Sequence, residues 1–241
     1  MKEYGVSIKG GLARGFGALG VVDWFQKEIQ IPPRVVAGSS SGAIVAAGVG
    51  ADLRLEEGMK ILRELKFFRD LVDTSKIWSN RSLVDSDLYR RKLETLFGAG
   101  TRIEELPTKL IVFATDPISK QRVYIEKGSL VDALMASSSY RPIFPAVKVN
   151  GNSLVDGDHT ENYSSGKLRE SGAEVVIGVG FKNRKGEKRR SFGEPVDIEI
   201  LYEVGNQGYI DFGEKLGLTV ENAFNAALLV REDVLSLIVD K

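Results

Sequence analysis

Residues 34–47 read RVVAGSSSGAIVAA, so an apolar run, a glycine-flanked serine triplet and an alanine-rich stretch follow one another directly. The apolar run is typical of a buried strand, and the alanine-rich stretch is typical of the first turns of a helix. A serine with a glycine two residues away on each side, at a turn from strand to helix, is the pattern of a nucleophile elbow. The pattern makes Ser40 the candidate nucleophile.

The sharpness of such a turn explains the two glycines. Side chains at Gly38 and Gly42 would clash with the neighbouring backbone, so we expect both positions to require glycine. The same turn lifts the Ser40 hydroxyl clear of the backbone and places it at the N-terminal end of a helix. The helix dipole favours a developing negative charge there.

The composition limits the classes of function. A chain of 241 residues, 43% hydrophobic and 27% charged, has the size of one soluble globular domain with a full core. Basic and acidic residues are equal at 33 each, so no net charge attracts nucleic acid or an anionic membrane. The absence of cysteine excludes disulfides, thiolate metal sites and a cysteine nucleophile. The one histidine, His159, excludes a site with several histidine ligands, and a Ser-His-Asp triad would have to use it.

The N-terminal residues lead directly into an apolar strand and then a glycine-rich turn, with no apolar core of a signal peptide. The longest apolar stretches are well short of the ~18 residues that a membrane-spanning helix needs. We therefore expect a cytoplasmic protein without a membrane anchor. The sequence does not indicate an oligomeric state.

The first 50 residues alternate strands, glycine-rich turns and helices. We expect a strand over 4–8, a glycine-rich turn over 9–15 and a helix over 16–28. Pro32 and Pro33 then separate this unit from the second strand and the elbow. This order predicts an α/β fold with a mainly parallel sheet.

The same patterns continue after residue 100. Further strands are expected at 109–114, 122–125 and 174–180, a hairpin at 147–155, and helices at 130–138 and 220–230. All of them fit one domain over 1–241, with the weakest pattern in a C-terminal extension over 181–241.

Residues 52–100 differ from the rest because they form long, charged, amphipathic helical patterns. We expect a helical insertion in the α/β domain. Its aromatic residues Phe67, Phe68 and Trp78 either pack in a core or belong to a lid over an apolar substrate groove. The segment could also contact a lipid surface transiently.

Acyl transfer needs donors for the oxyanion besides a nucleophile. Gly10 and Gly11, followed by the amide of Leu12, offer consecutive N–H groups on the turn after the first strand. Parallel strands would place this turn beside the elbow, because both lie at the carboxyl ends of strands. Arg14 either holds this turn and adds positive charge, or is a surface arginine at the start of a helix.

Asp156 is the candidate base. Gly157 follows it, which lets the backbone approach closely at that point. An aspartate has a reference pKa of about 3.9 and is a weak base, but burial beside Val155, Phe144 and Pro145 would raise its pKa. Ser40 and Asp156 could then work as a dyad. His159 could instead complete a triad, although it is close in sequence to Asp156.

Five motifs, in this order, resemble those of the patatin-like phospholipases. They are GGLARG at 10–15, GSSSG at 38–42, ATD at 114–116, YRPIFP at 140–145 and VDG at 155–157. The resemblance covers residues 4–180 and is weak beyond them. It implies a three-layer α/β/α sandwich with a mainly parallel central sheet, and the hydrolysis of lipid acyl esters.

The resemblance also assigns roles by position. It implies that Ser40 is the nucleophile and that Asp156 activates it. The oxyanion hole would consist of the backbone amides of Gly10, Gly11 and Leu12, with Arg14 beside them. The implied partner is a lipid or ester substrate, such as a phospholipid, a lysophospholipid or an acylglycerol. No metal ion and no cofactor is implied.

The chain departs from the family pattern in three places. Leu12 stands where a third glycine is usual, so the turn is more constrained there. Asp158 follows Gly157 where glycine or alanine is usual, and a second carboxylate would change the tuning of Asp156. The usual Asn-x-Pro stretch lacks its proline at 162–164. We expect these departures to alter rate or substrate more than to abolish activity.

Two other classes of function compete with this hypothesis. GFGALG at 15–20 matches the dinucleotide-binding pattern, but no carboxylate follows at the end of the second strand to bind a ribose. The glycines also fall inside the helical pattern, so close packing of a helix on the sheet explains them. The other alternative is a catalytically idle lipid-binding or scaffold protein of the same fold.

Overall fold

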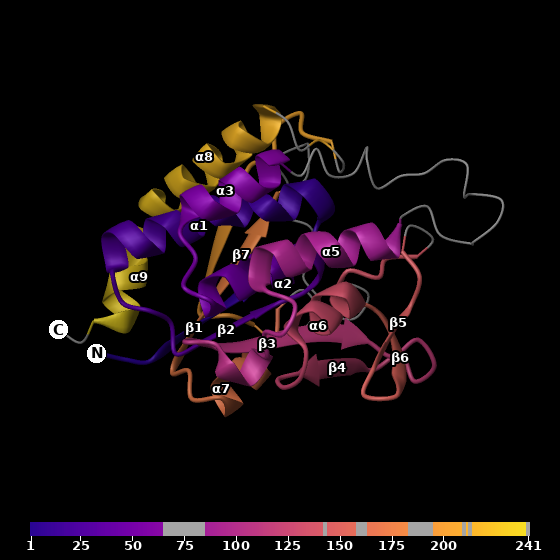
Figure 1. The fold of residues 1–241 in the computed structure, drawn as a ribbon. Coiled ribbons are helices and arrows are strands. Elements are labelled where there is room, and N and C mark those ends of the chain that lie inside the picture. The colour runs from indigo at the N-terminus through magenta and orange to yellow at the C-terminus, as the bar shows by residue number, and fades with distance from the viewer. Residues whose placement is uncertain are drawn as a thin grey trace.

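The computed structural model describes residues 1–64, 85–141, 144–157, 163–182, 195–208, 211 and 214–239. Its centre is a mixed sheet with the strand order β5-β6-β3-β2-β1-β7-β8, in which β4 also pairs with β3 (Figure 1). The strands are β1 Tyr4–Ile8, β2 Val35–Gly38, β3 Lys109–Thr115, β4 Arg122–Ile125, β5 Val147–Val149, β6 Asn152–Asp156, β7 Val175–Phe181 and β8 Ile198–Tyr202.

The helices follow the strands in the alternation that the sequence predicts. They are η1 Leu12–Gly17, α1 Ala18–Trp24, η2 Phe25–Ile29, α2 Ser40–Gly50, α3 Leu55–Glu64, α5 Ser86–Phe97, η4 Ile103–Glu105, α6 Leu130–Ser137, α7 Ser165–Glu170, α8 Glu214–Leu229 and α9 Arg231–Ile238. The first predicted helix is divided, because a 3-10 turn (η1) precedes α1 and a π-helical turn (η2) follows it.

The pairing is parallel through most of the sheet. β1 pairs in parallel with β2 and β7, β2 with β3, and β7 with β8. β4 and β6 run antiparallel to β3, and β5 runs antiparallel to β6. The predicted α/β class with a mainly parallel sheet is confirmed.

Two cores of unequal size lie on the two faces of the sheet. Successive strand residues alternate between them: Val36 belongs to the larger core, whereas Val35 and Ala37 belong to the smaller one. The larger core lies under α1, α2, α6 and α8, and the smaller one is covered by α7 through Leu168 (Figure 1). The fold therefore has three layers, one of them thin.

The C-terminal part, where the sequence pattern is weakest, is integrated into the fold. β8 extends the sheet beyond β7, and α8 packs along α1. α8 begins at Glu214, before the predicted start at residue 220, and α9 follows it. The edge strand β8 escapes prediction because three of its five residues are only partly buried and the charged residues Asp197 and Glu203 flank it.

Two glycines of the GFGALG stretch permit this packing. A Cβ at Gly20 would collide with the backbone of α8 at Val220, and one at Gly17 would collide with the Tyr202 ring. The close contact of Gly20 is therefore with a helix, not with the sheet as the sequence suggests. The glycines are explained by packing, which removes the reason to infer a dinucleotide site.

The predicted helical insertion contains α3 and α5. Asp85 caps α5, because its carboxylate accepts hydrogen bonds from the N–H groups of Asp87 and Leu88, both at 3.0 Å. The aromatic residues Phe67, Phe68 and Trp78 lie outside the described residues. No helix in the described part of the chain is both long enough and apolar enough to cross a membrane.

Candidate active site

The serine triplet forms the predicted turn between β2 and α2. Ser40 is the first residue of α2 and has a φ of 50°, in the left-handed region that non-glycine residues rarely adopt. A Cβ at Gly38 would collide with the Gly42 carbonyl, and one at Gly42 would collide with the backbone at Ile8. Only glycine fits at these two positions. Ser40 itself is 6% exposed.

A second serine, Ser137, stabilises the elbow through a hydrogen bond to its backbone. The N–H of Ser40 donates a hydrogen bond of 2.8 Å to Ser137 Oγ, at the end of α6. Ser137 Oγ in turn donates to the carbonyl oxygen of Phe113 in β3 at 2.7 Å. The elbow is therefore held against both α6 and β3 by Ser137, a residue that belongs to none of the five motifs.

The pairing of β3 brings the elbow and Asp156 to the same edge of this strand. Val112 pairs with Gly38 of β2 on one side and with β4 on the other. Ala114, two residues further on, pairs with Asp156 of β6 on one side and with β4 on the other. Since β4 occupies one edge of β3 in both pairs, β2 and β6 share the other edge. Asp156 therefore lies just beyond the end of β2, where the elbow with Ser40 begins.

Asp156 is the last residue of β6 and is 2% exposed. Its N–H donates to the carbonyl oxygen of Ser139 at 3.2 Å. Ser137 at the end of α6 and Ser139, two residues after it, thus bind the backbone of the two candidate catalytic residues. A Cβ at Gly157 would collide with the Phe113 carbonyl, so the segment after Asp156 also approaches β3 closely.

The glycine-rich turn lies beside the elbow, as parallel strands require. The N–H of Gly11 donates to Ser41 Oγ at 3.1 Å, which ties the turn to the serine triplet. The amides of Gly10 and Leu12 have no hydrogen-bond acceptor among the described residues. Leu12 has a φ of 53°, so it occupies a conformation that favours glycine. The third glycine that is usual in the family pattern thus falls at a position where the backbone has a positive φ.

These features coincide with a family match. A family model described as "Patatin-like phospholipase" matches residues 6–163. The chain belongs to the patatin-like phospholipase family. The resemblance that the five motifs suggest is confirmed.

Curated relatives of this patatin-like protein are distant and longer. Lysophospholipase NTE1 of Saccharomyces cerevisiae is 24% identical over 199 residues, which are 80% of this chain and 12% of that protein. An uncharacterized NTE family protein of Mycobacterium bovis is 27% identical over 199 residues, which are 81% of this chain and 54% of that protein. The chain thus spans little more than half of the bacterial relative, and a small part of the fungal one.

Solved structures share the fold at low identity. VipD from Legionella pneumophila superposes with a TM-score of 0.62 at 13% identity, covering 97% of this chain and 67% of VipD. The type III effector protein ExoU superposes with a TM-score of 0.58 at 13% identity, covering 98% of this chain and 54% of ExoU. At this identity the likeness concerns the fold alone.

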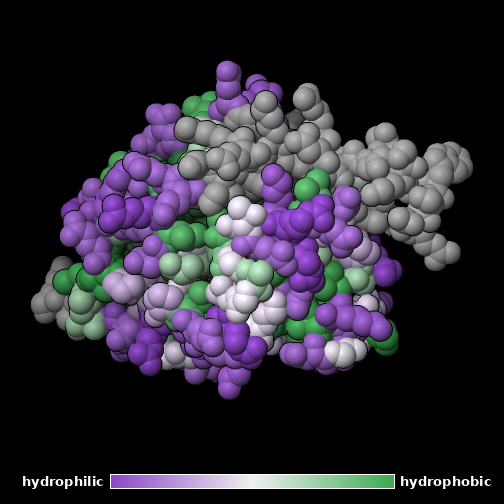
Figure 2. Space-filling model, in the orientation of Figure 1, coloured by the Kyte–Doolittle hydropathy of each residue, from purple (hydrophilic) through white to green (hydrophobic). Residues whose placement is uncertain are grey.

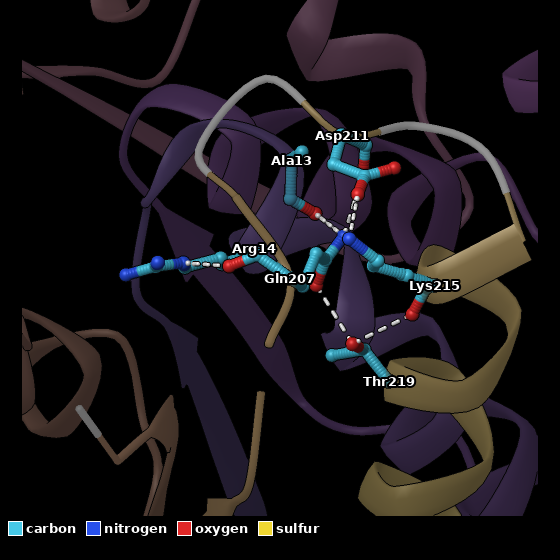
Figure 3. A network of polar contacts seen from close by, with 6 residues as sticks. All are labelled: Ala13, Arg14, Gln207, Asp211, Lys215 and Thr219. Carbon is cyan, nitrogen blue, oxygen red and sulfur yellow. Dashed lines mark hydrogen bonds and ion pairs between the residues drawn. The ribbon is translucent and has the colours of Figure 1, made fainter. Parts of the chain in front are cut away.

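Arg14 of the patatin-like protein is buried, not a surface arginine, with an exposed fraction of 4%. Its Nε donates to the backbone carbonyl of Gln207 at 2.9 Å (Figure 3). The Gln207 amide donates to the carbonyl oxygens of Ala13 at 3.4 Å and Asp211 at 2.9 Å, and its oxygen accepts from Thr219 Oγ1 at 2.7 Å. The C-terminal region thus stabilises the turn around Arg14, a role that no sequence motif indicates.

Tyr89 of α5 is a further residue that the sequence does not single out. Burial raises the pKa of its hydroxyl above the ordinary value, the Ser138 side chain partly lowers it, and the charge of Asp156 raises it further. The Tyr89 ring contacts Phe144, with 5.0 Å between the ring centroids. The helical insertion therefore reaches the surroundings of Asp156 through one buried tyrosine.

Asp158, His159 and Asn162 lie outside the described residues, so the alternative triad and two of the sequence departures have no structural account. Within the ranges that the structure covers, no group of three or more histidine, cysteine, aspartate or glutamate side chains is arranged to bind a metal ion.

Proposed function

We propose that this patatin-like protein is a serine hydrolase that cleaves the carboxylic ester bonds of lipids through a dyad of Ser40 and Asp156. The observation that carries the proposal is the pairing of β3, which sets Asp156 and the elbow end to end on one edge of the strand. Both residues are buried, and the backbone of each is hydrogen-bonded to Ser137 or Ser139, at and just after the end of α6.

In the proposed reaction, Asp156 accepts the proton of the Ser40 hydroxyl while Ser40 Oγ bonds to the ester carbonyl carbon. The tetrahedral intermediate then expels the alcohol, which takes the proton from Asp156. Water attacks the acyl-serine, with Asp156 taking its proton, and the fatty acid leaves as that proton returns to Ser40 Oγ. Atoms and protons balance, and the enzyme is regenerated.

The oxyanion would be stabilised by the glycine-rich turn. Support comes from the amides of Gly10 and Leu12, which are free of acceptors within the described residues. The Gly11 amide holds Ser41, so its contribution is to fix the turn against the elbow. The buried guanidinium of Arg14 adds positive charge on the same turn.

The proposed substrate class is supported by the family and by one relative's name. A lysophospholipase among the relatives supports a phospholipid or lysophospholipid, and an acylglycerol fits the same chemistry. We include in the proposal that residues 52–100 form a lid over the site and contact lipid surfaces transiently.

A fluorophosphonate probe tests the proposal. The wild-type protein should be labelled at Ser40, and Ser40→Ala should not be labelled. Asp156→Asn should keep the circular dichroism spectrum and lose ester turnover by about a hundredfold or more. A wild-type protein that binds lipid but shows neither labelling nor turnover would support the idle lipid-binding alternative. Full turnover in Asp156→Asn would support His159 as the general base instead.

A further inference from the structure

An apolar pocket lies between α1, α2, α3 and α5. Its volume is about 650 Å³, including its opening to solvent. Among the described residues that line it, all are apolar or glycine except Arg54 and Lys92. Figure 2 shows hydrophobic residues, framed by hydrophilic ones, where these helices meet in Figure 1. No carboxylate lines the described part of this pocket.

The pocket begins one helical turn from the proposed nucleophile. Ser40, Ile44 and Gly48 follow one another at intervals of four residues along α2, and the latter two line the pocket. With a rise of about 1.5 Å per residue, Gly48 lies roughly 12 Å along the helix from Ser40. α2 therefore runs from the elbow along the wall of the pocket.

α5 also connects the pocket with the surroundings of the proposed dyad. Tyr89, near Asp156, is followed at helical spacing by Leu93 and Leu96, which line the pocket. α2, which carries Ser40, and α5, which carries Tyr89 in the surroundings of Asp156, thus also line one apolar space. An ester carbonyl at Ser40 would have this space within reach of its acyl chain.

We infer that this pocket binds the acyl chain of the ester and that Gly48 sets the chain length that fits; the inference rests on the proposed function. A Cβ added at Gly48 would meet no heavy atom within 4 Å, so a larger side chain has room there. Since Gly48 lines the pocket, a larger side chain there would occupy volume that we assign to the acyl chain. At Gly58, across the pocket, a Cβ would touch Leu19 only in ordinary contact, at 3.4 Å.

The specificity of Gly48→Leu tests this assignment. We would measure kcat/KM for p-nitrophenyl butyrate, octanoate, dodecanoate and palmitate. Each methylene that the pocket buries should raise kcat/KM of the wild type by up to roughly fourfold. Gly48→Leu should lower kcat/KM for the longest accepted esters tenfold or more and leave butyrate within about twofold.

Gly217→Leu is the matched control. Gly217 is also a helical glycine at which a Cβ would meet nothing within 4 Å, but it is exposed on α8 and does not line the pocket. Leucine has a higher helix propensity than glycine at either position, so both variants should fold. The chain-length profile of Gly217→Leu should match that of the wild type.

The possible outcomes separate the two proposals. Hydrolysis with an unchanged chain-length profile in Gly48→Leu would overturn the pocket assignment and leave the proposed function intact. If the wild type hydrolyses no ester, the proposed function fails, and binding of dansyl-undecanoic acid then tests the pocket. Weaker binding by Gly48→Leu than by Gly217→Leu would support an acyl pocket, and equal binding would overturn it.

Discussion

The N–H of Ser40 donates a hydrogen bond of 2.8 Å to the hydroxyl of Ser137, a residue 97 positions later in the chain. Ser40 is held in the left-handed conformation, which costs about 1–2 kcal/mol for a non-glycine residue. The contact with Ser137 is one of the interactions that keep it there. The conformation of the proposed nucleophile thus depends on α6 as well as on its own turn.

Ser137→Ala should therefore weaken both the fold and the activity. The substitution leaves the buried Ser40 N–H without its acceptor, and we expect the free energy of unfolding to fall by about 1–3 kcal/mol. Urea unfolding and ester hydrolysis would measure the two effects. The exposed Ser236 is the control, since its substitution by alanine should change stability by about 0.5 kcal/mol or less. Unchanged stability and turnover in Ser137→Ala would contradict the role of this contact.

Leu12 should tolerate glycine better than a β-branched residue. With a φ of 53°, Leu12→Gly removes backbone strain, whereas Leu12→Val adds a branch at Cβ in a region where such residues are outliers. We expect Leu12→Gly to keep activity and Leu12→Val to lose stability by about 1 kcal/mol or more and activity with it. The comparison of kcat between the two variants is the measurement. Equal kcat values would show that the positive φ at residue 12 does not affect the activity of the glycine-rich turn.

Gln207→Ala should loosen the glycine-rich turn from the opposite end of the chain. It removes the hydrogen bonds to Ala13 and Thr219 inside a buried network, and we expect a loss of about 1–3 kcal/mol. Turnover should fall as well, because Ala13 belongs to the turn. Gln26→Ala, which removes an exposed hydrogen bond to Leu53, is the control for loss of a glutamine. Equal losses of stability and turnover in Gln207→Ala and Gln26→Ala would contradict the proposed role of Gln207 in holding the glycine-rich turn.

Three buried tyrosines predict a loss of stability in alkaline solution. Burial raises the pKa of Tyr4, Tyr89 and Tyr202, so they stay neutral in the folded protein at a pH where the unfolded chain ionises, above about 10. The unfolded state then binds fewer protons than the folded state. The free energy of unfolding should decrease by about 1.4 kcal/mol per pH unit for each tyrosine.

Unfolding in urea at several pH values above about 10 would measure this slope. Tyr89→Phe keeps the ring that contacts Phe144 and removes one ionisable group. Its slope should be smaller than that of the wild type by about 1.4 kcal/mol per pH unit. Parallel slopes for the two proteins would count against a neutral buried Tyr89.

The sequence predicts those parts of the site that backbone geometry dictates. Gly38 and Gly42 are readable because a tight turn excludes a Cβ. The central strands β1, β2, β3 and β7 are readable because nearly all of their residues are buried on both faces of the sheet. The elbow and the order of the first elements follow from these local demands. Asp156 is readable as the candidate base from the glycine that follows it and from its apolar neighbours, and the family resemblance implies the same role.

The supports of the site are not readable in the same way. Ser137 and Gln207 are single polar residues that act on partners 97 and 193 positions away, and no periodicity marks them. Tyr89 sits in a helix whose amphipathic pattern is explained by packing alone. Such long-range contacts are decided by the tertiary fold, so they become visible only in three dimensions.

Because β2 and β6 pair with successive parts of the same edge of β3, the pairing register of this one strand sets the separation of the two proposed catalytic groups. The chain between them can lengthen or shorten in its surface loops without altering that spacing. Substitutions in the segments that face the substrate can therefore change specificity while the two proposed catalytic groups keep their separation.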